Sequence, residues 1–206
     1  MDYLVSNLNE DSKKEILYTF KIVITGGGGV GKTCLFNRFC FNSFNFDTSM
    51  TIGINFHSIN LKIRKKEAPG ELIEKCIANS IFDFGGQERF KPLIPKFISG
   101  ANGALLVFDL TDLSSLKQLD FWYEQLIQHA DGQKIPKILV ASKSDLIAHE
   151  NQSIIMDNQK ITKFIEEKNL DAFFLTSALS NYNVVKVFTK LNNLMLDGIK
   201  TSYEVI

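Results

Sequence analysis

The nine residues "TGGGGVGKT" at positions 25–33 constrain the fold more than any other part of the sequence. They follow the β-branched run "YTFKIVIT" (18–25) and lead into "KTCLFNRFCF" (32–41), where apolar residues recur at helical spacing. The predicted order is therefore strand, glycine-rich loop and helix. Because glycine costs conformational entropy wherever it stands, four in a row indicate that the backbone itself must approach something closely.

The spacing within this loop is that of a phosphate-binding loop. Gly26 is followed, after four residues, by Gly31, Lys32 and Thr33. Backbone N–H groups at the start of the helix can point at phosphate oxygens, Lys32 supplies a positive charge, and the Thr33 hydroxyl can ligate Mg²⁺. A merely flexible glycine turn is the alternative, and the strand and helix on either side argue against it.

The rest of the chain alternates apolar strands with longer helical patterns. We expect further strands at 56–64, 75–84, 104–110, 137–143 and 172–178, and further helices at 114–130, 158–168 and 182–199. The first two of these strands form a predicted hairpin, because Pro69 and Gly70 give a turn signal between them. The pattern predicts an α/β fold with a mostly parallel, six-stranded sheet, helices on both faces, and ligands at the carboxyl ends of the strands.

Composition narrows the classes of partner. With 206 residues, 45% of them hydrophobic, the chain is long enough for one domain with a sizeable core. Lys plus Arg and Asp plus Glu both number 23, so net charge favours neither nucleic acid nor an anionic membrane. Three cysteines without metal-ligand spacing indicate reduced packing residues, and the histidines suggest no metal site either.

The sequence also predicts where the protein resides. No apolar run approaches the roughly 18 residues of a membrane span, and the N-terminus lacks an apolar signal core. Residue 2 is Asp2 rather than glycine, and no cysteine follows Cys76, so no lipid anchor is expected. We therefore expect a cytoplasmic protein whose membrane recruitment, if any, comes through partners.

A second motif, "DFGGQE" (83–88), follows the predicted strand at 75–84. The Asp83 carboxylate at a strand end can hold a Mg²⁺-bound water, and the Gly86 N–H can reach a terminal phosphate. An ordinary buried aspartate in a turn is the alternative reading. The phosphate-binding loop beside it favours the magnesium role.

Two further tetrapeptides follow the last two strands. In "SKSD" (142–145), the Asp145 carboxylate can accept hydrogen bonds from guanine N1 and N2, while the Lys143 stem can lie over the ring. The backbone of "TSAL" (176–179) can meet the base carbonyl. Each tetrapeptide is weak alone, but their order and spacing make the set specific.

Taken together, these motifs resemble the Ras superfamily of small GTPases, which are P-loop NTPases, over roughly residues 18–199. Within it the sequence is most similar to the Rab family. The stretch "TIGINF" (51–56) resembles the first switch of that family, and "GGQERF" (85–90) resembles the second. The resemblance implies GTP and GDP as ligands, with Mg²⁺ as the cofactor.

The resemblance also assigns roles to single residues. It implies that Thr51 closes on Mg²⁺ and the γ-phosphate, that Gln87 orients the attacking water, and that Phe44 flanks the guanine. For this last role Phe41 and Phe46 remain alternatives. The predicted catalytic residues are Gln87, Lys32 and Thr51, and the predicted metal ligands are Thr33, Thr51 and, through water, Asp83. The predicted nucleotide-binding residues are Gly26, Gly28, Gly29, Val30, Gly31, Lys32, Thr33, Cys34, Phe44, Thr51, Asp83, Gly86, Ser142, Lys143, Asp145, Ser177, Ala178 and Leu179.

Partners follow from the same resemblance. Rab proteins present an aromatic triad to effectors, and Phe56, Phe82 and Phe97 occupy its positions here, although core packing is the ordinary role of such residues. An exchange factor and a GTPase-activating protein are expected on the switch face, and the protein is expected to be a monomer. Trp122 is expected to pack in the core.

The sequence departs from the family at several positions. Ser142 replaces the usual asparagine of the guanine motif, Gly85 replaces the usual alanine before Gly86, and Leu179 replaces the usual lysine. The hairpin carrying 65–75 is longer than expected, and the lipidated tail is absent. These departures bear on nucleotide affinity and membrane attachment rather than on the fold.

The leading interpretation is a slow GTP-hydrolysing switch that regulates trafficking or signalling through effectors. The alternative is a nucleotide-binding scaffold that keeps the fold but hydrolyses little GTP. An ATPase is disfavoured, because adenine would leave the Asp145 carboxylate without its two donors. The expected domain division is a polar extension at 1–17, the GTPase domain at 18–200 and a short tail at 201–206.

Overall fold

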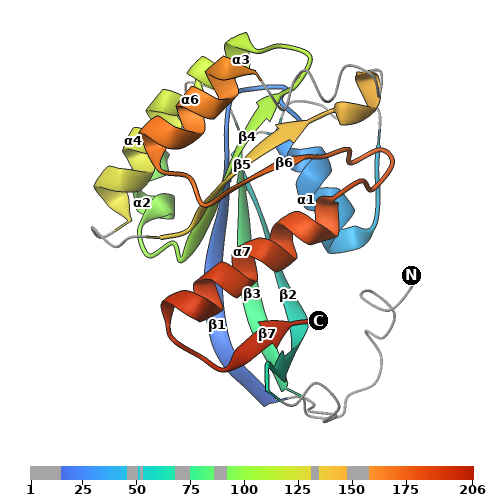
Figure 1. The fold of residues 1–206 in the computed structure, drawn as a ribbon, viewed down its shortest axis with the longest axis vertical. Coiled ribbons are helices and arrows are strands. Elements are labelled where there is room, and N and C mark those ends of the chain that lie inside the picture. Colours follow the sequence, from blue (N-terminus) through green and yellow to red (C-terminus); the bar gives the residue numbers. More distant parts are fainter. Residues whose placement is uncertain are drawn as a thin grey trace.

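The computed structural model describes residues 15–45, 51, 53–67, 75–85, 92–130, 135–147 and 158–206 (Figure 1). Its strands are β1 (Glu15–Thr25), β2 (Ile54–Lys65), β3 (Lys75–Phe84), β4 (Gly103–Asp109), β5 (Lys137–Ser142), β6 (Ala172–Leu175) and β7 (Tyr203–Val205). Its helices are α1 (Lys32–Phe41), α2 (Ile94–Ile98), α3 (Ser114–Lys117), α4 (Leu119–His129), α6 (Gln159–Lys168) and α7 (Val184–Gly198), with a 3₁₀ turn η2 (Ser144–Leu146). The predicted α/β class is confirmed.

The strands form one sheet in the order β6-β5-β4-β1-β3-β2-β7. Strand β1 pairs in parallel with both β3 and β4, and β5 pairs in parallel with β4 and β6. Strand β2 is antiparallel to β3, as the predicted hairpin requires. The chain therefore turns from one half of the sheet to the other at β1, and ligands of such sheets bind at the carboxyl end of that switch point.

The prediction of six strands was wrong, because the described residues form seven. The additional strand β7 pairs with the end of β2, where Val205 lies opposite Ile63 and Glu204 lies opposite Arg64. The Val205 side chain is buried, and the Arg64 Nε donates to Glu204 Oε1 over 2.8 Å. Three residues are too few for a periodic pattern, so only the contacts with β2 make this segment a strand.

Most predicted elements are confirmed within a few residues. Strand β1 begins three residues before the predicted start at 18, and the predicted helix over 114–130 is two helices, α3 and α4. Gln118 lies between them and keeps right-handed helical angles, with φ −66° and ψ −18°. The interruption therefore changes the hydrogen bonding more than the direction of the chain. The short helix α2 was not predicted.

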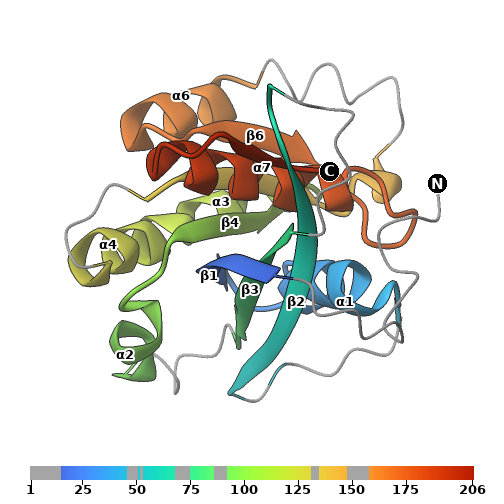
Figure 2. The same cartoon turned by 90° about the horizontal axis from the view of Figure 1, so that it is seen from below.

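Helices cover both faces of the sheet, as predicted, and each face has its own core. One core packs α1 and α7 against the sheet, with Phe39 and Phe188 stacked at a centroid distance of 3.7 Å. The other packs α2, α3, α4 and α6 against the opposite face and includes Trp122, which is buried as expected. Figure 2 shows the sheet between α1 on one side and α2 and α4 on the other.

Helix α1 is fixed at both ends by backbone geometry. Gly31 precedes it with φ +89°, and Asn42 follows it in the left-handed conformation with φ +48°. Its buried face carries Leu35, Phe36 and Phe39. Burying each of these side chains stabilises the fold by roughly 1.5–3 kcal/mol relative to leaving it exposed to water. The start of α1 is therefore held firmly against the carboxyl end of β1.

In the described part of the chain, none of the helices has the length and apolar character that crossing a membrane requires. None of the three cysteines forms a disulfide; Cys40 and Cys76 are buried and Cys34 is half-buried.

Candidate functional site

The predicted motifs meet at one edge of the sheet. The glycine-rich loop follows β1, Asp83 lies near the end of β3, Ser142 ends β5, and residues 176–179 follow β6. Because β1, β3, β4, β5 and β6 run in parallel, their carboxyl ends all open onto this edge. Residues from opposite ends of the sequence are thereby brought into one site.

Three glycines of the loop, Gly26, Gly29 and Gly31, have a positive φ that L side chains rarely adopt. A side chain at Gly26, where φ is +144°, would place its Cβ 2.2 Å from the Val107 carbonyl oxygen. Gly31, which precedes α1, has φ +89°. Within the loop, Gly28 and Gly29 are exposed and Val30 is buried. The loop thus lies tightly on β4 at one end and presents exposed backbone further along, as a phosphate site requires.

Lys32 lies across this loop rather than pointing into solvent. It is buried, and its Nζ donates to the carbonyl oxygens of Gly26 and Gly27 over 2.9 and 2.5 Å. Burial lowers the pKa of Lys32 to about 8, and the nearby Asp83 carboxylate partly offsets this. The ammonium group is therefore pre-positioned over the loop and is poorly solvated, so that an anion placed there would stabilise its charge.

Three side-chain oxygens from three separate segments form a cluster beside Lys32. The Thr33 hydroxyl donates to Asp83 Oδ2 over 2.7 Å and lies 2.6 Å from the Thr51 hydroxyl oxygen. Asn55 Nδ2 also donates to Asp83 Oδ2, over 3.1 Å. The structure therefore places the predicted residues Thr33, Thr51 and Asp83 together.

The oxygen cluster fits Mg²⁺. Asp83 is fully buried, and its Oδ1 has no hydrogen-bond partner among the described residues. Burial raises the pKa of Asp83, while the hydrogen bond from Thr33, the charge of Lys32 and the hydrogen bond from Asn55 oppose that rise. A buried carboxylate oxygen without a donor is costly, and a hard cation with oxygen ligands relieves that cost.

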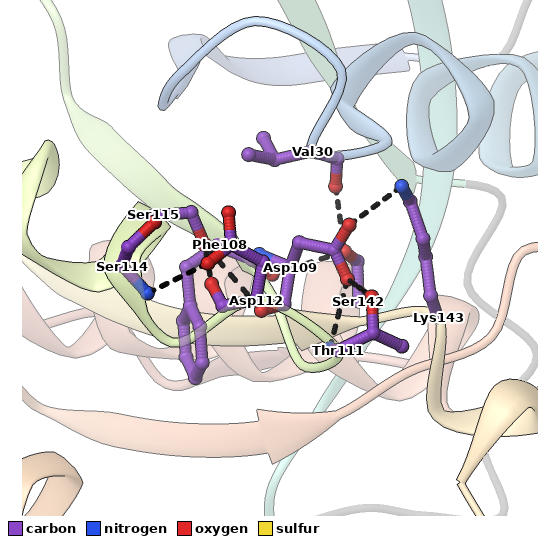
Figure 3. Close-up of polar contacts among 9 residues, drawn as sticks. All are labelled: Val30, Phe108, Asp109, Thr111, Asp112, Ser114, Ser115, Ser142 and Lys143. Atoms are coloured by element: carbon purple, nitrogen blue, oxygen red, sulfur yellow. Dashed lines mark hydrogen bonds and ion pairs between the residues drawn. The ribbon is translucent and has the colours of Figure 1, made fainter.

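At the other end of the site, Ser142 faces the glycine-rich loop (Figure 3). Its hydroxyl oxygen lies 2.6 Å from the Val30 carbonyl oxygen and 2.9 Å from that of Phe108. A hydroxyl has one hydrogen, so it serves these two acceptors by turns or shares it between them. Ser142 is buried and joins the end of β5 to the loop after β1.

Lys143 is held by a carboxylate that the sequence analysis did not single out. Its Nζ lies 2.6 Å from Asp109 Oδ2, as Figure 3 shows, and its backbone is left-handed with φ +60°. Burial favours a raised pKa for Asp109, but the hydrogen bond from Lys143 and those from Thr111 outweigh it and lower the pKa. The only sequence signal for Asp109 was its position at the end of the apolar run 104–110.

The remaining base-end residues differ in exposure. Asp145 lies in η2 and is exposed, and it accepts no hydrogen bond from the described residues. Ser177 is buried, and its hydroxyl accepts from the Ser180 N–H over 3.1 Å. The carbonyl oxygens of Ala178 and Leu179 both accept from the Arg38 guanidinium. Asp145 thus presents its carboxylate to solvent beside a loop whose backbone is fixed.

Several predicted residues have weaker structural support. Cys34 in α1 and Phe44 just after it are half-buried, and the alternative Phe41 is half exposed, its ring tilted against that of His57 at 4.6 Å between centroids. Gly86, Gln87 and Phe46 lie outside the described residues.

The predicted aromatic triad forms one continuous patch. The Phe56 and Phe82 rings lie 5.0 Å apart between centroids, and the Phe82 and Phe97 rings lie 6.3 Å apart. Phe56 is 56% exposed, whereas the other two are half-buried against the core. Lys21 Nζ lies 4.9 Å from the centroid of the Phe82 ring. The patch therefore combines an exposed aromatic ring with a neighbouring positive charge.

Comparison with known proteins agrees with this geometry. The sequence model of the Ras family matches residues 21–197. The chain belongs to the Ras family. It is 35% identical over 174 residues to the Ras-related protein rab-11.1 of Caenorhabditis elegans, covering 84% of this chain and 75% of that protein. It is 37% identical over 174 residues to the Ras-related protein RABE1e of Arabidopsis thaliana, covering 84% and 73%.

Membership of the Ras family settles the activity in general terms. This small GTPase binds GTP and GDP with Mg²⁺, hydrolyses GTP to GDP and acts as a molecular switch, and within the superfamily it is most similar to Rab proteins. The predicted family, fold and GTPase activity are confirmed, and the non-hydrolysing scaffold is not favoured. The individual site residues stay predictions.

Proposed function

We propose that this Ras-family GTPase switches through the cluster of Thr33, Thr51 and Asp83. The observation that carries the proposal is the 2.6 Å contact between the Thr33 and Thr51 hydroxyl oxygens beside the fully buried Asp83. Thr33 and Asp83 lie on α1 and β3, whereas Thr51 lies before β2 and has to be brought in. A ligand that favours Thr51 in this position therefore favours one of two states of the chain.

The phosphate end works by positioning charge. The exposed backbone of the loop and the buried Lys32 ammonium receive the phosphates, and Lys32 moves from the Gly26 and Gly27 carbonyls to phosphate oxygens. Thr33, Thr51 and Asp83, the last through water, would hold Mg²⁺, which neutralises charge on the phosphates when bound. Gln87 orients the attacking water, and the γ-phosphate draws Thr51 into the cluster.

The base end selects guanine. Asp145 presents two acceptor oxygens to guanine N1 and N2, and the Lys143 stem covers one ring face while Asp109 holds its ammonium group. The backbone after Ser177 meets the base carbonyl, and Phe44 flanks the ring edge. Adenine offers neither donor to Asp145, so the carboxylate would remain unpaired.

Hydrolysis by the protein alone is slow, and partners set the rate. No arginine of the described residues reaches the oxygen cluster, and Arg38 is bonded to carbonyl oxygens at the base end. We expect a GTPase-activating protein to supply the missing charge, with the exposed Gly28 leaving room for it. An exchange factor and effectors bind the switch face, where Phe56, Phe82 and Phe97 form the apolar patch.

The cellular setting follows from the Rab likeness. The protein is a cytoplasmic monomer that reaches membranes through partners and regulates intracellular trafficking. Its GTPase domain covers residues 18–200, with a polar extension before it, and residues 201–206 complete the sheet as a tail.

The deciding experiment identifies the nucleotide that copurifies with the protein and then follows GTP hydrolysis in a single turnover. We expect bound GDP or GTP and slow, Mg²⁺-dependent hydrolysis. The Gln87→Leu variant should hydrolyse at least about 10-fold more slowly while its GTP affinity changes little, because it removes only the group that orients water. Adenine nucleotide in the purified protein, or unchanged hydrolysis in Gln87→Leu, would contradict the assignment.

A further inference from the structure

Arg38 joins α1 to the loop that follows β6. Its Nε donates to the Ala178 carbonyl oxygen over 2.6 Å, and its Nη2 donates to the Leu179 carbonyl oxygen over 3.2 Å. Its Nη1 donates to the Asn42 carbonyl oxygen over 3.0 Å, at the end of the same helix. The planar guanidinium group therefore holds two consecutive carbonyl groups of the loop in one arrangement, which a single ammonium group cannot do.

Other contacts fix the two ends of this loop. The Ser144 N–H donates to the Thr176 carbonyl oxygen over 3.0 Å, and Ser177 exchanges two backbone hydrogen bonds with Tyr182. Among the described residues, only Arg38 donates to the carbonyl oxygens of Ala178 and Leu179. The orientation of the Ala178–Leu179 peptide group therefore depends on Arg38, whereas the following peptide group is also held by the Ser180 N–H, which donates to the Ser177 hydroxyl oxygen over 3.1 Å.

Fixing a carbonyl group also fixes the N–H group of the next residue. In a trans peptide the two point in opposite directions within one plane. Because Arg38 draws the Ala178 carbonyl towards α1, the Leu179 N–H points away from that helix. The N–H groups of Ala178 and Leu179 donate to none of the described residues, so they remain available for an acceptor on a ligand.

The same helix carries the phosphate site at its start. Lys32 opens α1 and Arg38 lies six residues later, about 9 Å along the axis. The helix is held to α7 by the stacked rings of Phe39 and Phe188. A single rigid element therefore sets the distance between the phosphate-binding loop and the loop at 176–179.

We propose that Arg38 is a positioning residue for guanine recognition, which holds the Ala178 carbonyl group and so aims the backbone N–H group of Leu179 at the carbonyl oxygen of the base. This inference rests on the proposed guanine site. It explains how the loop tolerates Leu179, whose side chain is 40% exposed and makes no polar contact: recognition there depends on the backbone. The guanidinium acts through the loop and does not touch the nucleotide.

The test compares GDP with 6-thioguanosine diphosphate, which keeps both donors read by Asp145 but replaces the carbonyl oxygen with sulfur, a weaker acceptor. Dissociation constants are measured for the wild type, Arg38→Met and Arg38→Lys. We expect the wild type to prefer GDP, and we expect Arg38→Met to reduce that preference roughly 3- to 10-fold. Arg38→Lys should fall between them, because its ammonium cannot hold both carbonyl groups in a plane.

Arg64→Met is the matched control, since it removes an arginine whose guanidinium bonds, in the part of the chain that the structure describes, to Glu204 at the far end of the sheet, and it should leave the preference unchanged. Thermal unfolding of each variant checks that it is folded. If Arg38→Met does not fold, Arg38→Lys still tests the proposal.

The outcomes separate this inference from the proposed function. If the wild type binds both nucleotides equally, the loop does not read the base carbonyl and the role of Arg38 falls, while recognition of guanine through Asp145 still stands; if it binds neither nucleotide, the proposed guanine site falls. If the wild type prefers GDP but Arg38→Met weakens both nucleotides by the same factor, Arg38 is merely structural and the inference is overturned while the guanine site stands.

Discussion

At the phosphate end of the site, Thr33, Thr51 and Asp83 contact one another through their own side chains, whereas at the base end Arg38 and Ser142 hold backbone carbonyl groups. The first arrangement depends on which side chain stands at each position. The second depends on backbone direction, which several side chains can support. This difference accounts for the departures from the family at Ser142 and Leu179.

The departures at the base end have a common explanation. Ser142 and Leu179 replace residues usual in the family. Ser142 nevertheless binds the Val30 carbonyl oxygen, and the backbone of Leu179 is held through its carbonyl group by Arg38. Lys32, Thr33, Thr51 and Asp83 show no such variation at the phosphate end. Mutations should therefore have larger effects at the phosphate end.

The largest effect is expected for Thr33→Asn. This change removes the hydroxyl that contacts both Asp83 and Thr51, so it should weaken Mg²⁺-dependent GTP binding by roughly 100-fold and GDP binding less. Titration of both nucleotides with and without Mg²⁺ measures this. Thr201→Asn, far from the site, is the control. Equal losses for GTP and GDP would mean that Thr33 does not link the metal to the switch.

A smaller effect is expected for Gly85→Ala, which restores the residue usual in the family. Its Cβ would lie 2.5 Å from the Thr51 carbonyl oxygen and 3.0 Å from that of Gly53, so the backbone carrying Thr51 must shift. We expect GTP affinity to fall roughly 10-fold relative to GDP affinity, with folding stability little changed. Gly198→Ala is a suitable control, because its added Cβ would meet open space, whereas Gly29→Ala is not a suitable control. An unchanged ratio would show that Thr51 does not need the space beside Gly85.

A moderate effect at the base end is expected for Asp109→Asn. The amide keeps an acceptor for Thr111 but loses the charge that holds Lys143, so GDP should dissociate roughly 5-fold faster. Asp112→Asn is the matched control, because Asp112 lies in the same cluster and is exposed, and among the described residues its side chain accepts a hydrogen bond from the Ser114 N–H alone. Stopped-flow release of a fluorescent GDP measures both. Equal rates for the two variants would remove Lys143 from base binding.

The smallest effect is expected for Ser142→Asn, and it should be a gain. The single hydrogen of the serine hydroxyl is already directed at protein carbonyl groups, whereas an amide has two N–H groups and can serve Val30 and the base together. GDP should bind roughly 2- to 5-fold more tightly. Competition against a fluorescent nucleotide measures this, with Ser142→Ala expected to bind more weakly than the wild type. A loss in Ser142→Asn would show that the buried space next to Gly31 admits only serine.

The order of these effects tests whether the phosphate end depends on side-chain identity more strongly than the base end does. If Ser142→Asn or Asp109→Asn changed affinity more than Thr33→Asn, the base end would depend on side-chain identity as strongly as the phosphate end does. The backbone explanation for Leu179 would then fail too.

Much of the site could be predicted because its motifs are local. Gly26 to Thr33 are consecutive, and their spacing alone specifies loop, charge and hydroxyl. Thr51 was assigned by resemblance, and the structure places its hydroxyl against that of Thr33. By contrast, Asn55 carried no signal, and the position of Asp109 at the end of an apolar run was too weak a signal, because an amide in a strand or an aspartate at a strand end is ordinary.

The sequence by itself determined the phosphate-binding loop, the alternation of strands and helices and the family. All three depend on the order and spacing of residues that are close together in the sequence. Only the tertiary structure decided that Arg38 holds Ala178, 140 positions away, that Asp109 holds Lys143, and that Tyr203–Val205 forms a seventh strand on β2. The physical reason is that such contacts join residues distant in sequence. A single arginine, aspartate or three-residue run has no periodicity, so its partner exists only once the sheet has assembled.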